Sequence, residues 1–155
     1  GLKVAAAAAY HVDEDDNAGG DTVDIDRFGI SAAALHSPSG IHVEGGYSQR
    51  ETDTLAGVQT TDETHWWIAA GIQFRASELG TSDITIDYIA NETDFLTAGV
   101  NDVIDYDSFG IGFAQNIDAI GGTMYLSYRH HEADDNLTNV DDDFDQIQFG
   151  MRLRY

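Results

Sequence analysis

Apolar and polar residues alternate along most of the chain, in segments that polar stretches separate. In the last segment, Ile147, Phe149, Met151 and Leu153 alternate with glutamine, glycine and arginine. Because successive side chains of a β-strand point to opposite faces, a period of two predicts strands with one apolar and one polar face. We expect eight strands, near residues 2–12, 24–36, 40–50, 64–76, 81–92, 105–117, 121–132 and 143–155.

The connections between these strands alternate in length. SPSG, ASELG and NIDAIGG are short, whereas the other four connections are long and polar and, with their flanks, hold 22 of the 28 acidic residues. Short turns at one end and long loops at the other are typical of bacterial outer-membrane β-barrels. We therefore expect one domain over residues 1–155, with both termini on the periplasmic side and strongly acidic loops outside the cell.

Composition removes several other classes. The formal net charge of −21 excludes nucleic acid as a partner, because such a surface repels phosphate. The chain has no cysteine, which excludes thiolate metal sites, and no apolar run approaches the ~20 residues of a membrane-spanning helix. The start, GLKVAAAAAY, reads as a strand and not as a signal peptide, so we expect either a removed peptide or a segment of a longer chain. A soluble acidic β-sandwich remains the more distant alternative.

The charged residues of the strands share one parity. All seven basic residues are on the polar parity: Lys3, Arg27, Arg50, Arg75, Arg129, Arg152 and Arg154. We expect them to point into the barrel, because a Lys or Arg on the lipid face costs about 2–4 kcal/mol at the bilayer midplane. Glu44, Asp83 and Asp87 share this parity and complete the predicted pore-lining set. Any half-buried sheet also places its charges on one face, so parity alone does not identify a membrane protein.

The carboxy-terminal QFGMRLRY has a polar residue, a glycine two positions on, and hydrophobic residues at the third-last and last positions: Gln148, Gly150, Leu153 and Tyr155. It resembles the assembly signal that the barrel-assembly machinery recognises in outer-membrane proteins. Residues 123–155 resemble the last hairpin of Gram-negative general porins, and the likeness is diffuse over the remainder. The final residue is Tyr where Phe is commoner. The chain has about half the length of a sixteen-stranded porin. No segment resembles the inward-folded constriction loop that such porins carry in their first half.

The resemblance implies an antiparallel up-and-down transmembrane barrel, with two alternatives. Eight strands closed on themselves enclose a space that side chains fill, whereas sixteen leave an aqueous channel. The inward parity is rich in small residues and has few acids, so the cations lack the partners that a sealed interior needs. We expect the carboxy-terminal half of a sixteen-stranded porin, through which small hydrophilic solutes and ions diffuse passively. The alternative is a complete eight-stranded barrel with a structural or adhesive role and no open pore.

Enzymatic activity is not expected. His130, His131 and Glu132 lie together near an expected loop, but adjacent side chains on a strand point to opposite faces. The two histidines therefore cannot flank one substrate without a distorted backbone. We expect no cofactor, and we interpret His11, His36, His42 and His65 as rim or lumen residues.

A loosely bound calcium ion is the one metal that the sequence offers. In the stretch DEDDNAGGDTVD, oxygen-bearing residues fall at the spacing of an EF-hand loop: Asp13, Asp15, Asn17, Asp21 and Asp24. Ala18 replaces the required glycine, and the flanks are strands, so a solvated acidic loop is the favoured interpretation. The expected partners are outer-membrane lipid and lipopolysaccharide, the barrel-assembly machinery and, by the resemblance, two further copies in a homotrimer.

Overall fold

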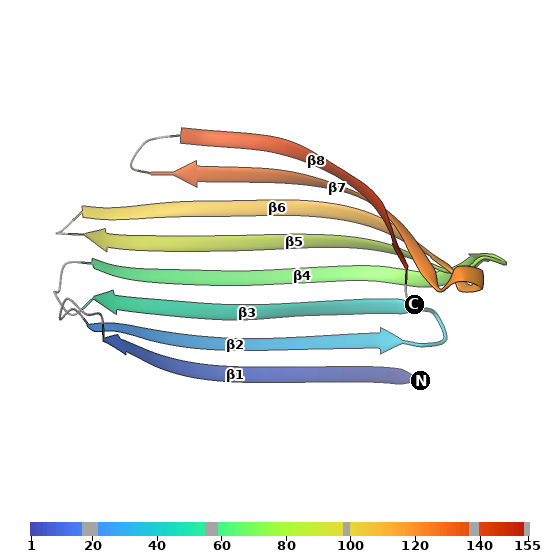
Figure 1. Cartoon of the computed structure of the whole chain (residues 1–155), viewed down its shortest axis with the longest axis horizontal. Coiled ribbons are helices and arrows are strands. Elements are labelled where there is room, and N and C mark those ends of the chain that lie inside the picture. Colours follow the sequence, from blue (N-terminus) through green and yellow to red (C-terminus); the bar gives the residue numbers. More distant parts are fainter. Residues whose placement is uncertain (17–21, 55–58, 98–99, 137–139, 154–155) are drawn as a thin grey trace.

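The computed structural model describes residues 1–16, 22–54, 59–97, 100–136 and 140–153. These residues form one antiparallel sheet in which each strand pairs with the next along the chain (Figure 1). The strands are β1 (Leu2–Asp16), β2 (Thr22–His36), β3 (Ile41–Thr54), β4 (Gln59–Ser77), β5 (Gly80–Thr97), β6 (Val100–Ile117), β7 (Gly122–Asp135) and β8 (Val140–Leu153). The prediction of an all-β, up-and-down arrangement of eight strands is confirmed.

The strands extend further towards the long connections than predicted. The first hairpin is paired up to Asp16 and Thr22, and the fifth strand reaches Thr97. Most residues of the four expected long loops therefore lie in strands, and the prediction of long loops is wrong in extent. The apolar alternation stops earlier because both faces of these strand ends are polar, but backbone pairing needs no apolar side chains.

The short connections lie at the opposite end of the sheet, as predicted. Residues 37–40 form the turn between β2 and β3, where Gly40 has a φ of 71°, a left-handed conformation that favours glycine. A 3-10 turn, η1 (Asp118–Ile120), joins β6 to β7 and ends at Gly121, whose φ is 61°. No helix among the described residues is long and apolar enough to span a membrane.

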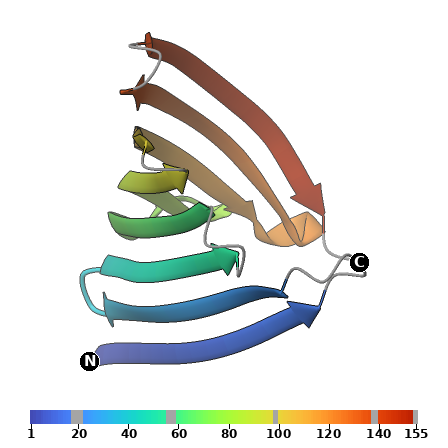
Figure 2. The ribbon, with the colours of Figure 1, turned by 90° about the vertical axis from the view of Figure 1, so that its left-hand side faces the viewer.

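The sheet is curved like a trough, with β1 and β8 at its two edges (Figure 2). Within the described ranges, β1 pairs only with β2, and β8 pairs only with β7. The outer edges of β1 and β8 thus carry no ladder of hydrogen bonds in the described part of the chain.

The polar parity faces the inside of the curve. Ala69, Ser108 and His131, all of this parity, are buried, whereas most large apolar side chains of the other parity are 36% to 84% exposed. Ser82, beside the turn between β4 and β5, is a buried exception on that other parity. Side chains converge on the concave face of a curved sheet and spread apart on the convex one. We therefore call the two surfaces the concave polar face and the convex apolar face.

Candidate membrane-facing and pore-lining surfaces

The convex apolar face is continuous across all eight strands. The register places Ile30 opposite Tyr47 and Tyr47 opposite Trp66, and at the other edge Leu126 lies opposite Phe149. This register confirms the prediction that Phe149, Met151 and Leu153 share one apolar face of the sheet. A contiguous exposed apolar surface of this extent marks a region that contacts lipid or another protein.

Aromatic residues mark the boundary of the convex apolar face towards the long connections. The boundary residues, one in each of the first seven strands, are Tyr10, Phe28, Tyr47, Trp66, Tyr88, Phe109 and Tyr128. Trp66 and Tyr88 are in contact, with ring centroids 5.1 Å apart. We call this row the aromatic belt; such girdles occur at the membrane interfaces of outer-membrane barrels.

The aromatic belt crosses the strands obliquely. Phe28 is opposite Gln49, two positions beyond Tyr47, and the same shift of two residues recurs between β4 and β5 and between β6 and β7. A shift of about one residue per strand, with a rise of about 3.3 Å per residue and about 4.8 Å between strands, corresponds to a strand tilt of about 35°. Strands of outer-membrane barrels are tilted by about 35–45°. The belt would therefore lie level in a membrane if the strands had the tilt of such a barrel.

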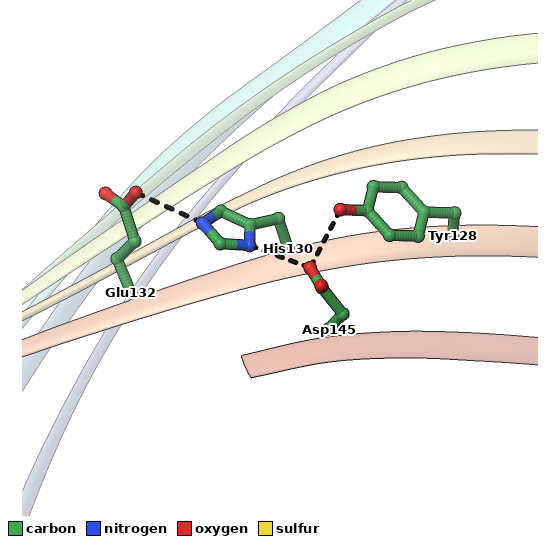
Figure 3. A network of polar contacts seen from close by, with 4 residues as sticks. All are labelled: Tyr128, His130, Glu132 and Asp145. Carbon is green, nitrogen blue, oxygen red and sulfur yellow. Dashed lines mark hydrogen bonds and ion pairs between the residues drawn. The ribbon is translucent and has the colours of Figure 1, made fainter. Parts of the chain in front are cut away.

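Beyond the belt the convex side becomes acidic, and β7 and β8 carry a polar network there (Figure 3). His130 has Asp145 Oδ1 at 2.9 Å from Nδ1 and Glu132 Oε1 at 3.2 Å from Nε2, and the Tyr128 hydroxyl donates to Asp145 at 2.8 Å. Both ring nitrogens donate only when the ring is protonated, so the carboxylates, Asp145 foremost, raise the pKa of His130. Hydrogen bonds from His130 and then Tyr128 lower the pKa of Asp145.

The concave polar face carries the charged residues that the sequence assigned to it. The register puts these described members of the predicted pore-lining set on one face: Lys3, Arg27, Arg50, Arg129, Arg152, Glu44, Asp83 and Asp87. Arg75 falls in the irregularity between Phe74 and Ser77 and has no register partner. Arg154 lies outside the described residues. Their shared face is therefore found, and the claim that they line water stays a prediction.

Two polar bridges on this face cross an intervening strand at a glycine. Arg129 on β7 reaches Asp87 on β5 with 2.5 Å between Nη2 and Oδ2, and the residue between them on β6 is Gly110. A Cβ at Gly110 would lie 2.6 Å from Asp87 Oδ1 and 2.9 Å from Arg129 Nη2. These two side chains therefore lie flat against the wall in the space that glycine leaves.

The second bridge joins β3 to β5. His42 Nε2 donates to Asp83 Oδ2 at 3.1 Å, and both side chains are largely covered. A Cβ at Gly71 on β4 would lie 2.5 Å from His42 Nε2. Asp83 also accepts a hydrogen bond from Thr85, so its carboxylate is held on both sides.

More of the cations are paired than the sequence indicated. Arg50 lies 3.3 Å from Glu63, and Arg75 lies 3.7 Å from Asp118. Glu63 was missed because the fourth strand was expected to begin at residue 64. The sequence argument that the cations lack partners is therefore wrong for these two and for Arg129. Within the described part of the chain, Lys3, Arg27 and Arg152 make no ion pair.

Sequence reasoning also missed a buried cluster around His131. His131 is 7% exposed, shares a hydrogen bond with Tyr106 through Nδ1, and stacks on Phe144 with ring centroids 4.3 Å apart. Directly opposite His131, Ser108 is 3% exposed and accepts a hydrogen bond from Arg129 at 2.9 Å. The sequence does place Tyr106, His131 and Phe144 on the polar parity of neighbouring strands. Their contact could not be predicted without the register of those strands.

The terminal motif is described in part. Gln148 and Gly150 are on the concave polar face and Leu153 is on the convex one, while Tyr155 lies outside the described residues. Gly150 is opposite Tyr125, and a Cβ at Gly150 would lie 2.5 Å from the Tyr125 hydroxyl oxygen. The glycine of the motif therefore makes room for a tyrosine ring, and its role in assembly stays a prediction.

The residues of the expected calcium loop do not come together in the described part of the chain. Asp13 and Asp15 are in β1 and Asp24 is in β2, while Asn17 and Asp21 lie outside the described residues. Asp24 is opposite Glu14, so it faces the side opposite to Asp13. Among the described residues, no group of three or more histidine, aspartate or glutamate side chains is placed to hold a metal ion. Calcium binding stays a prediction without the loop that it assumed.

His130 and His131 point to opposite faces, as the strand geometry predicted. His130 contacts Asp145 and Glu132 on the convex side, whereas His131 contacts Tyr106 and Phe144 on the concave side. These two histidines therefore do not flank one substrate.

Solved structures with a similar arrangement are outer-membrane β-barrel proteins. The chain matches the outer membrane protein OmpT of Vibrio cholerae, in its trimer form, with a TM-score of 0.57 and 14% identity over 96% of this chain and 49% of OmpT. It matches BauA, the ferric preacinetobactin receptor of Acinetobacter baumannii, with a TM-score of 0.53 and 10% identity over 85% of this chain and 28% of BauA. No protein-family model and no curated protein matches the sequence. The chain thus has the fold of part of an outer-membrane barrel and spans about half the length of OmpT.

Proposed function

We propose that this chain forms part of the wall of a porin, a water-filled barrel in a bacterial outer membrane through which small hydrophilic solutes and ions diffuse. The observation that carries the proposal is the pairing of the two faces: a convex apolar face bounded by an aromatic belt, and a concave polar face on which the Arg129–Asp87 and His42–Asp83 bridges lie flat over glycines. Side chains that lie along the wall leave the interior open, as a channel requires.

The open edges support a barrel with more than these eight strands. An unpaired strand edge in hydrocarbon costs several kcal/mol per unsatisfied backbone group, so membrane-spanning sheets close. β1 and β8 are at opposite edges of the trough (Figure 2). We propose that further strands pair with both edges. The trimer form of OmpT supports an association of three such barrels.

The orientation follows from the same features. The short turns, the start of β1 at Leu2 and the end of β8 at Leu153 lie at one end of the sheet (Figure 1). Outer-membrane barrels have short turns on the periplasmic side. We propose that these ends are periplasmic and that the acidic strand ends project outside the cell, next to lipopolysaccharide. No chemical step and no cofactor is part of the proposal.

Planar-bilayer recording on the full-length natural product tests this function. The variant neutralises the three cations without an ion pair: Lys3→Gln, Arg27→Gln and Arg152→Gln. Inward cations exert a local field that attracts anions, so the variant should shift selectivity towards cations. The shift should shrink as salt rises and the Debye length falls below ~10 Å.

The matched control keeps the charge, with Arg27→Lys and Arg152→Lys, and should leave selectivity unchanged. Stable insertion without conductance would contradict the channel and favour a closed barrel of structural or adhesive role. An ion selectivity that is unchanged in the triple glutamine variant would show that these residues do not face the permeating ions.

A further inference from the structure

A hollow on the concave polar face lies among β1, β2, β3 and β4. It has a volume of about 260 Å³, is floored by Ala7, Gly29 and Ser31, and is bordered by Ser48, His65 and Trp67. We call it the β1–β4 hollow. Its floor consists of small residues, and none of the residues that line it takes part in the bridges made by Arg129 and His42.

The Trp67 indole gives this hollow a flat wall. A Cβ at Gly46 would lie 2.7 Å from Trp67 Nε1, so the indole lies over Gly46 on β3. Trp67 Nε1 makes no hydrogen bond within the described part of the chain and is an available donor. A flat aromatic face beside a free N–H suits a ligand with a planar apolar body.

Two arginines lie beyond the lining of the hollow, towards the long connections. Arg27 is directly opposite Arg50, and each is two positions beyond a residue of the hollow, Gly29 and Ser48, which is about 7 Å along a strand. Like charges directly opposite each other destabilise a sheet. A contribution to the stability of the sheet therefore does not explain this pair of arginines. Glu63 pairs with Arg50 only, and Arg27 is exposed and makes no ion pair among the described residues.

We propose that the β1–β4 hollow binds small carboxylates with a flat apolar body, of the size of benzoate. The carboxylate accepts hydrogen bonds from Arg27 and Arg50, whose guanidinium groups match its planar geometry. The apolar body lies on the small-residue floor against Trp67. The site rests on the proposed function through its wetted polar face, and it adds a solute class that the passive channel alone does not predict.

Fluorescence of Trp67 reads the site directly. These 155 residues have two tryptophans, and Trp66→Phe leaves Trp67 as their one indole while it keeps an aromatic ring in the belt. Any tryptophan in the rest of the full-length protein is replaced by phenylalanine in the same background. The full-length Trp66→Phe protein in detergent micelles is titrated with 4-nitrobenzoate, a quencher, and with 4-nitrobenzyl alcohol, its neutral analogue. We expect saturable quenching by the carboxylate, and binding of the alcohol weaker by about tenfold, because the neutral alcohol forms no charge-assisted hydrogen bond with the arginines.

Four variants sharpen the result. Arg27→Gln with Arg50→Gln should raise the Kd of the carboxylate about tenfold, Arg27→Lys with Arg50→Lys should retain most of the binding, and Lys3→Gln should change nothing. Gly29→Val fills the floor and should abolish binding of both compounds. A Cβ there meets Ser48 Cβ at 3.6 Å, an ordinary contact, so the sheet tolerates it; the far-ultraviolet circular dichroism checks this.

Equal affinity for the carboxylate and the alcohol, or an unchanged Kd in the double glutamine variant, would overturn the proposed site. Because quenching is an equilibrium measurement in micelles, a protein that quenches normally but does not conduct would contradict the channel and leave the site standing. A protein that conducts without saturable quenching would do the reverse.

Discussion

The concave polar face has two regions that share one parity and one curvature but differ in construction. Over β5 to β7, Asp87, Arg129 and Ser108 are joined by hydrogen bonds across three strands, and His131 is buried beside them. In the middle of β1 to β3 the wall consists of alanine, glycine and serine, and beside this stretch Arg27 makes no ion pair among the described residues.

This difference shows that a polar face is not one environment. Where a glycine separates opposite charges by one strand, long side chains lie across it and fix each other. Where small residues continue over several strands, the wall stays bare, and a cation there faces solvent. We therefore expect the β5–β7 region to hold the sheet together and the β1–β3 region to contact solutes.

Filling a glycine should separate the two regions most strongly. Gly110→Val places a side chain 2.6 Å from Asp87 Oδ1 and should lower the free energy of unfolding by about 2–3 kcal/mol, as overpacking does. Gly29→Val in the bare region should cost less than about 0.5 kcal/mol. Urea unfolding of both variants in lipid vesicles measures the contrast. Equal losses of unfolding free energy would mean that Gly110 does not make room for the Asp87–Arg129 bridge.

The ion pairs should differ in the same way. Asp87 and Arg129 have side chains 23% and 26% exposed, so a double-mutant cycle to alanine should give a coupling of about 1–2 kcal/mol. Arg50 and Glu63 are each 41% exposed, and solvent screening should reduce their coupling to below about 0.5 kcal/mol. A larger coupling for the exposed pair would reverse the comparison.

The His131 cluster should contribute less than the bridge. Tyr106→Phe removes the hydroxyl that bonds to His131 Nδ1 and leaves a polar atom of a buried ring unpaired, which should cost about 1 kcal/mol. Ser31→Ala on the bare wall should be neutral within about 0.5 kcal/mol. Thermal unfolding in the same vesicles compares the two; a neutral Tyr106→Phe would show that His131 needs no such partner.

The smallest effect should come from the exposed network on the convex side. The folded-state pKa of His130 is raised, so its stabilising effect is full below the unfolded-state value near 6.5 and is lost as pH rises through the folded-state value. The pKa of Asp145 is lowered, so its own contribution is present above about 3.8 and is lost in acid. The unfolding midpoint of the wild type should exceed that of His130→Gln at about pH 5.5, and less so at about pH 8.5. A difference that grows with pH would contradict the network.

Much of the fold was predictable because strand alternation is a local property. The eight strands, the facing of Phe149 and Leu153 and the short turn at residues 37–40 all follow from nearest neighbours in the sequence. The strand ends were not predictable from hydropathy, since residues such as Glu63 and Asp94 pair in the sheet with no apolar face to mark them.

The candidate surfaces were predictable by parity but not by partner. The sequence placed Arg129 and Asp87 on one face, but their contact depends on a register in which Gly110 falls between them. The sequence indicated that the glycines leave a wide lumen. It did not indicate that side chains of neighbouring strands lie over these glycines. Burial of His131 likewise depends on the register, which places Phe144 on the next strand directly opposite it.

Accessibility of single cysteines to a charged, membrane-impermeant thiol reagent tests the central claim most directly. These 155 residues have no cysteine, and any cysteine in the rest of the full-length protein is first replaced by serine, so each introduced residue reports alone. Ser31→Cys and Ser48→Cys are on the concave polar face, while their neighbours Ile30→Cys and Tyr47→Cys are on the convex apolar face. In full-length protein assembled in lipid vesicles, the first two should react and the second two should not. Reaction at Ile30 and Tyr47 with protection at Ser31 and Ser48 would contradict a lipid-facing apolar surface around a water-filled interior.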